Sequence, residues 1–145
     1  MYLIFLNSLI RRIMKKIAIT DITLKKLSQD RSLSLLFREK TAIAACAASL
    51  GVNAVELPPM KNAREDTIIN KTISQNVSGT TVVIGIGFTK ESVNEAWESV
   101  KDAQNPRLQI EVPTSTVQME YTYHIKADKM LEKIAELVCE AKKLC

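Results

Sequence analysis

Residues 80–88, with the sequence TTVVIGIGF, form the clearest strand candidate in the chain. The run is rich in β-branched side chains, which is typical of a strand that is buried on both faces. Such strands occur where helices cover a parallel sheet, so this segment favours an α/β fold.

On both sides of this segment the chain alternates between strand-like and helical patterns. Strands are predicted at 16–20, 52–57 and 108–112, and helices at 36–50, 63–75 and 91–103. A final helix is expected from an N-cap at Asp128, and Gly51 follows the first helix where a left-handed residue would end it. The polar stretch 21–34 is a loop candidate. The chain therefore predicts four strand-then-helix units.

The long crossovers between these strands imply parallel pairing with right-handed connections. Four units can form a small open sheet or half of a (β/α)₈ barrel, which typically needs about 250 residues. The 145 residues of this chain match half a barrel better than a whole one. In either architecture, functional side chains are expected at the carboxyl ends of the strands, in segments 21–29, 56–60, 85–90 and 113–121.

Several polar residues lie in these segments. Lys25 and Lys26 could hold a carboxylate or phosphate, or could belong to a solvated loop. Glu56 lies near the end of an otherwise apolar strand, so its carboxylate needs a partner or a shifted pKa, whether its role is functional or structural. Thr114 and Ser115 could donate hydrogen bonds to a carboxylate substrate or cap the next turn.

Gly85 and Gly87 do not complete a dinucleotide-binding fingerprint, because Lys90 stands where its third glycine would be. These glycines are expected to permit close packing or backbone approach.

Composition argues against several other classes of protein. The net charge of +4 arises from 20 basic and 16 acidic residues of mixed order, and the one Trp, three Tyr and three Phe are scattered, unlike a nucleic-acid-binding surface. With His124 as the single histidine, no Ser/His/Asp set is assignable and no pair of histidine ligands exists for a transition metal. Cys46, Cys139 and Cys145 lack the spacing of a disulfide framework or zinc cluster, which fits a reducing cytoplasm.

The first ten residues are apolar and are followed by Arg11, Arg12, Lys15 and Lys16. A signal peptide has the opposite order of charge and apolar residues, and a membrane span needs about 20 apolar residues. We therefore expect residues 1–14 to be an N-terminal extension, with Met1 or Met14 as the start, and residues 15–145 to form the domain. A short amphipathic membrane anchor is the alternative.

The segment Asp21-Ile-Thr-Leu-Lys-Lys-Leu-Ser-Gln29 resembles D-T-T-L-R-D-G-E-Q, the opening motif of the homocitrate synthase and isopropylmalate synthase family, which includes hydroxymethylglutaryl-CoA lyase. Collinear similarities follow at 38–40, 50–59, 96–103, 113–115 and 120–121, with 57–60 and 112–115 most like the homocitrate synthase branch. The resemblance covers about residues 15–145 and implies the N-terminal half of a TIM barrel.

Members of that family condense acetyl-CoA with a 2-oxo acid, which a divalent Mg, Mn or Zn ion holds and polarises. The resemblance implies that Lys25 replaces the arginine that stabilises the oxyanion and that Lys26 replaces a metal-binding aspartate. It also places Gln29 and Glu56 near the metal and substrate, and Thr114 and Ser115 at the polar end of the fourth strand. An ammonium cannot ligate a cation, and the family's HxH ligand pair lies on a later strand that this chain does not contain.

We therefore expect a chain that binds no catalytic metal alone and is inactive by itself. It could be one subunit of a split synthase, completed by a complementary C-terminal half or by self-association, or a diverged paralogue. The alternative is a non-catalytic organic-acid-binding or regulatory module that uses Lys25 and Lys26. No nucleic-acid or membrane partner is expected.

Overall fold

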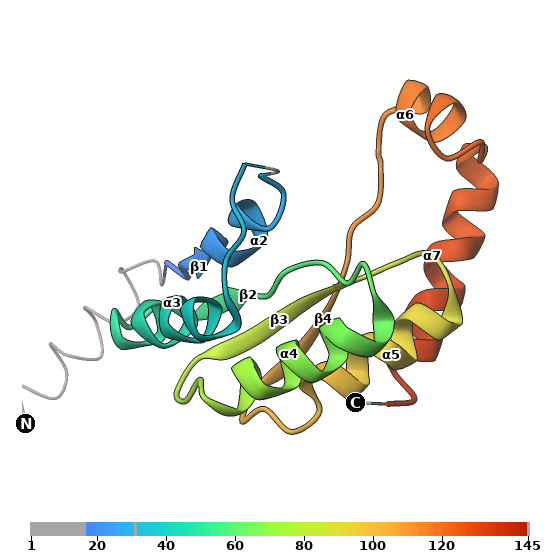
Figure 1. The fold of residues 1–145 in the computed structure, drawn as a ribbon. Helices are drawn as coiled ribbons and strands as arrows, with labels where there is room; N and C mark the ends of the chain where they lie inside the picture. The colour runs from blue at the N-terminus through green and yellow to red at the C-terminus, as the bar shows by residue number, and fades with distance from the viewer. Residues whose placement is uncertain (1–16, 31, 145) are drawn as a thin grey trace, which may run out of the picture.

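The computed structural model describes residues 17–30 and 32–144, so the predicted extension 1–14 lies outside it. Within these residues a parallel sheet has the strand order β1-β2-β3-β4, with helices between the strands (Figure 1). The strands are β1 (Thr20–Asp21), β2 (Ala54–Glu56), β3 (Thr81–Ile86) and β4 (Pro106–Ile110). The helices are α2 (Thr23–Leu27), α3 (Phe37–Ser49), α4 (Ala63–Gln75), α5 (Lys90–Val100), α6 (Thr116–Tyr121) and α7 (Ala127–Ala141). The predicted α/β fold with four parallel units is confirmed and is consistent with part of a TIM barrel.

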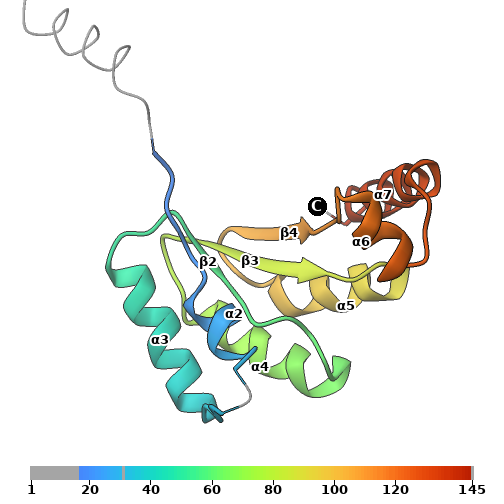
Figure 2. The same ribbon diagram turned by 90° about the horizontal axis from the view of Figure 1, so that it is seen from above.

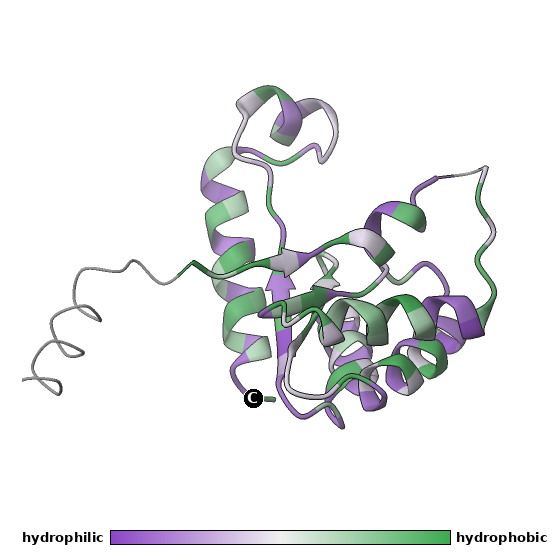
Figure 3. Ribbon diagram, turned by 90° about the vertical axis from the view of Figure 1, so that its left-hand side faces the viewer, coloured by the Kyte–Doolittle hydropathy of each residue, from purple (hydrophilic) through white to green (hydrophobic). Residues whose placement is uncertain are grey.

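The core lies between one face of the sheet and the long helices. Figure 2 shows α3, α4 and α5 side by side along the sheet, and α7 packs against α5 and β4. Alternate residues of β3 point into this core, namely Val82, Ile84 and Ile86. There they meet apolar residues of α4, α5 and α7, namely Ile73, Val93, Val100 and Leu137. In Figure 3, α7 is the tall helix below α6, and its hydrophobic and hydrophilic segments alternate as expected for a helix buried on one side.

The register of the strands determines which side chains project from the opposite face of the sheet. Glu56 of β2 pairs with Val83 of β3, and Gly85 of β3 pairs with Gln109 of β4. Paired residues in adjacent strands project from the same face of a sheet, and residues two apart in a strand share a face. Glu56 and Gln109 therefore lie on the same side, away from the core helices.

Two predictions for the first unit were wrong. Residues 21–34 are not all loop, because α2 forms there with Leu24 buried in the core. The carboxylate of Asp21 accepts hydrogen bonds from the backbone N–H and hydroxyl of Thr23, at 3.1 and 2.9 Å, which start this short helix. The first strand was predicted at 16–20, of which residue 16 lies outside the described residues, but β1 is limited to Thr20–Asp21. The carbonyl oxygen of Ile19 accepts hydrogen bonds from the backbone N–H groups of residues 53 and 54, and the N–H of Ile19 donates to Asn53 Oδ1 at 2.7 Å.

Two further details differ near the C-terminus, and one prediction about a turn is confirmed. Lys126, not Asp128, is the N-cap of α7, and Asp128 lies in the first turn, where its charge favours the helix dipole. The segment 113–121 contains the short helix α6.

Gly51 has the predicted left-handed backbone, with φ of 78°. No helix in the described part of the chain is long and apolar enough to cross a membrane.

Candidate functional site

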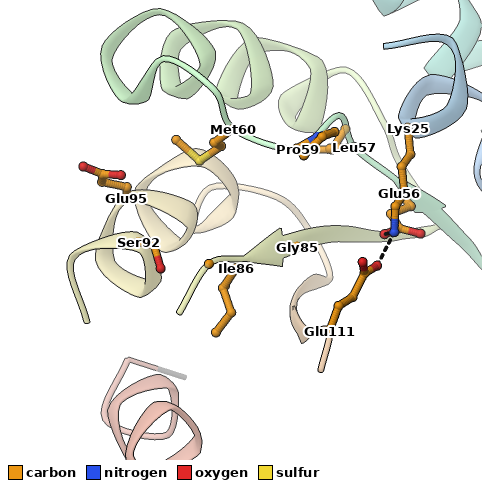
Figure 4. A pocket seen from close by; sticks show the side chains of 11 residues that line it. Lys25, Glu56, Leu57, Pro59, Met60, Gly85, Ile86, Ser92, Glu95 and Glu111 are labelled. Atoms are coloured by element: carbon orange, nitrogen blue, oxygen red, sulfur yellow. Dashed lines mark hydrogen bonds and ion pairs between the residues drawn. The ribbon is translucent and has the colours of Figure 1, made fainter. Parts of the chain in front are cut away.

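A cavity of about 240 Å³ opens at the carboxyl ends of the strands, where functional residues were expected. Its apolar wall includes Leu57, Met60 and Ile86. Figure 4 shows that Lys25, Glu56 and Glu111 converge at one end of the cavity, whereas Ser92 and Glu95 lie at the other end. The cavity therefore has a charged end and an apolar wall.

Four side chains make a closed set of hydrogen bonds at the charged end, and we call Lys25, Glu56, Gln109 and Glu111 the lysine–glutamate cluster. The Lys25 Nζ donates to Glu56 Oε1 at 2.8 Å and also to Glu111 Oε1. The Gln109 Nε2 donates to the same two oxygens, at 3.1 Å to Glu56 and 2.9 Å to Glu111. Each of these carboxylate oxygens thus accepts from both donors.

The fold brings these residues together from three separate segments. Lys25 lies on α2, Glu56 ends β2, and Gln109 and Glu111 lie on and just after β4. Strand β3 runs between β2 and β4, but its residue opposite Gln109 is Gly85, which has no side chain. The side chains of β2 and β4 can therefore meet across β3.

The two glycines at the end of β3 differ in their surroundings. A Cβ at Gly85 would meet no atom within 4 Å, so the expected close approach is not found there. At Gly87 a Cβ would lie 3.1 Å from Ser92 Oγ, which confirms close packing at that position.

The charges of the cluster are strongly paired. Glu56 is only 4% exposed, and a carboxylate buried to that extent needs a partner because desolvation disfavours its charged form. The hydrogen bonds from Lys25 to Glu111 and Glu56 raise the pKa of Lys25 above its ordinary value. The hydrogen bond from Lys25 is also the main cause that lowers the pKa of Glu111. The ammonium and the Glu111 carboxylate therefore both stay charged at neutral pH.

The structure separates the residues that the sequence proposed for the site. Lys25 and Glu56 line the cavity and contact each other. Lys26 and Gln29 are exposed on and beside α2, and neither lines this cavity. Thr114 and Ser115 are also exposed and outside its lining, although Ser115 is the N-cap residue of α6, without a side-chain capping bond.

Gln109 and Glu111 were not among the sequence candidates. They alternate with Leu108 and Ile110 in the predicted strand 108–112, so the period of two already placed both polar side chains on the face away from the core. That alternation was the signal that could have identified them.

Parallel strand-helix units with a cavity at the strand ends are consistent with a partial TIM barrel, and comparison with known proteins gives the family. The model of the HMGL-like family matches residues 16–145, and this chain belongs to that family. A 2-isopropylmalate synthase of Clostridium kluyveri is 33% identical over 131 residues, which are 90% of this chain and 26% of that enzyme. The 2-isopropylmalate synthase of Halalkalibacterium halodurans is 30% identical over 125 residues, 86% of this chain and 24% of that enzyme. The chain thus spans about a quarter of the length of these relatives.

Proposed function

We propose that this chain is an isopropylmalate or homocitrate synthase-like half-barrel that does not condense acetyl-CoA with a 2-oxo acid by itself. The family and the names of the relatives support the synthase-like class. The arrangement of the lysine–glutamate cluster supports the lack of activity.

The single observation that carries this proposal is the position of the Lys25 ammonium between the carboxylates of Glu56 and Glu111. A family enzyme needs a divalent metal to hold the 2-oxo acid, but here Lys26 replaces the metal-binding aspartate and its side chain is exposed. Within residues 17–30 and 32–144, no group of three or more His, Cys, Asp or Glu side chains is arranged to hold a metal ion. The residues described do not fit the family's metal.

The contacts of Lys25 with Glu56 and Glu111 also disfavour binding of an anionic substrate. A 2-oxo acid is an anion, and the positive charge of Lys25 is already shared between two carboxylates. Glu95 adds a third carboxylate to the cavity lining. An anionic substrate would meet net negative charge here, which also weakens the alternative of an organic-acid-binding module built on Lys25.

The proposed route to an active protein is completion of the barrel. Strands β1 and β4 are the outer strands of the sheet, and each has one edge without a partner strand among the described residues. Additional strand-helix units, on a complementary polypeptide or a second copy of this chain, would pair with these edges, and the complementary polypeptide would supply the missing ligands. We expect the assembled protein to be cytoplasmic.

An assay of thiol release from acetyl-CoA tests the proposal. The purified chain is incubated with 2-oxoisovalerate or 2-oxoglutarate and Mg²⁺, Mn²⁺ or Zn²⁺, with the Clostridium kluyveri 2-isopropylmalate synthase as the positive control. We expect no release above the rate without protein. Substrate-dependent turnover by the chain alone would refute the proposal.

A further inference from the structure

We propose that the Lys25 ammonium is a built-in substitute for a divalent cation, and that removing it converts Glu56 and Glu111 into a site that accepts one. This inference concerns the same cluster as the proposed function, but it is a statement about cation binding and not about turnover.

The contacts of Lys25 resemble those of a bound cation. Its Nζ lies between one oxygen of Glu56, at 2.8 Å, and one oxygen of Glu111. An ammonium is a compact point charge, whereas a guanidinium would bind a single carboxylate through a planar pair of donors. Lysine at this position can therefore bridge two separate carboxylates, as a small cation would.

Burial makes this ammonium necessary. Glu56 is almost completely buried, and the side chain of Lys25 is only 19% exposed. If the ammonium is removed, the carboxylate of Glu56 keeps a hydrogen bond from Gln109 but forms no ion pair with another cationic side chain of the described residues. A buried, uncompensated charge favours whatever cation can reach it. The cavity beside the cluster provides that access.

The remaining groups have the right chemistry for a hard cation. Mg²⁺ and Mn²⁺ prefer oxygen ligands, and Glu56 and Glu111 supply carboxylates. Gln109 now donates through Nε2 to both carboxylates, but rotation of its amide would present its carbonyl oxygen to a cation in their place. Three protein oxygens completed by water would form a weak site, with a Kd of about 10⁻⁴ to 10⁻³ M.

The test compares thermal unfolding of the wild type and Lys25→Met with and without 10 mM Mn²⁺. Methionine keeps an unbranched side chain without the charge. We expect no shift for the wild type, a lower Tm for the variant, and recovery of about 4–10 °C on addition of Mn²⁺, as saturation of a weak site requires. Binding of Mn²⁺ is followed independently by the loss of the free-ion electron paramagnetic resonance signal.

Two variants control this comparison. Lys26→Met removes the same charge from the exposed neighbouring residue and should leave both Tm and the Mn²⁺ response unchanged. Lys25→Met combined with Glu56→Gln removes the buried carboxylate as well, so it should fold without Mn²⁺ and bind none. If Lys25→Met does not fold in the absence of cation, circular dichroism should show Mn²⁺-dependent folding.

The inference is overturned if the wild type binds Mn²⁺ as Lys25→Met does. It is also overturned if Mn²⁺ neither raises the Tm of a folded Lys25→Met nor induces folding of an unfolded one. Binding of Mn²⁺ by the double variant would overturn it as well. Failure of the proposed function would appear separately, as turnover by the wild-type chain in the thiol assay.

Discussion

The pairing between Lys25 and Glu56 predicts a measurable coupling energy. At 2.8 Å, two unit charges attract by about 6 kcal/mol for an effective dielectric constant of 20. Desolvation of both groups offsets much of this attraction. Because the Lys25 side chain is 19% exposed and that of Glu56 is 6% exposed, the net coupling should lie between the values for surface and fully buried pairs, at about 2 kcal/mol.

A double-mutant cycle measures this quantity. Lys25→Met should cost about 3 kcal/mol, because it leaves the Glu56 carboxylate buried without a positive partner. Glu56→Gln should cost about 1–2 kcal/mol, because the amide can still accept a hydrogen bond and Lys25 retains Glu111. The double variant should then be about 2 kcal/mol more stable than the sum of the single changes predicts.

Urea unfolding, followed by far-ultraviolet circular dichroism in metal-free buffer, gives the four free energies. The slopes with urea should agree among the variants, so that differences in midpoint report stability and not a change in the exposed surface. Additivity within about 0.5 kcal/mol would refute the reasoning, since it would mean that Lys25 and Glu56 do not interact.

Three further predictions concern other parts of the molecule. The pKa of Glu111 is lower in the folded protein than in the unfolded chain, where it is about 4.3. Glu111 therefore stabilises the fold at pH values above the unfolded pKa, and this contribution should be lost as the pH falls through the folded pKa. A Tm profile from pH 7 to 3 should fall less steeply for Lys25→Met, and parallel profiles would contradict the assignment. Leu137→Ala, at a fully buried position of α7, should cost about 2–5 kcal/mol in urea unfolding, whereas Leu131→Ala, 66% exposed on the same helix, should change stability by less than about 0.5 kcal/mol. Equal losses would show that α7 does not pack as described. Gly51→Ala should cost about 1–2 kcal/mol of stability because the backbone φ at this position is positive. Gly85→Ala should be tolerated, because an added Cβ would meet no atom within 4 Å. A lower Tm for Gly85→Ala than for Gly51→Ala would contradict these backbone assignments.

Regular elements were predictable where their side-chain pattern was long enough to be periodic. The helices at 63–75 and 91–103 and the strand at 80–88 each contain several apolar residues at the spacing of their structure, and α4, α5 and β3 form there. Helix α2 has only Leu24 buried, so no period could reveal it. The local hydrogen bonds that Thr23 donates to Asp21 and the packing of Leu24 in the core decide the conformation.

The candidate site was predictable in part for a related reason. Glu56 stood out because an acid at the end of an apolar strand requires compensation, and this requirement is visible in the sequence. The identity of its partners was not visible. Lys25 and Gln109 lie 31 and 53 residues away from Glu56, and only the order of the strands brings them within hydrogen-bonding distance.

The sequence by itself determined the succession of strand-helix units, the family, and the presence of lysine at positions 25 and 26, because each depends on residue type and spacing along the chain. Only the tertiary structure decided that these two lysines differ, with Lys25 drawn between two carboxylates and Lys26 left in solvent. The physical reason is that the direction of each side chain follows from the short helix α2 and from the register of β2, β3 and β4, and both depend on packing between segments far apart in the chain.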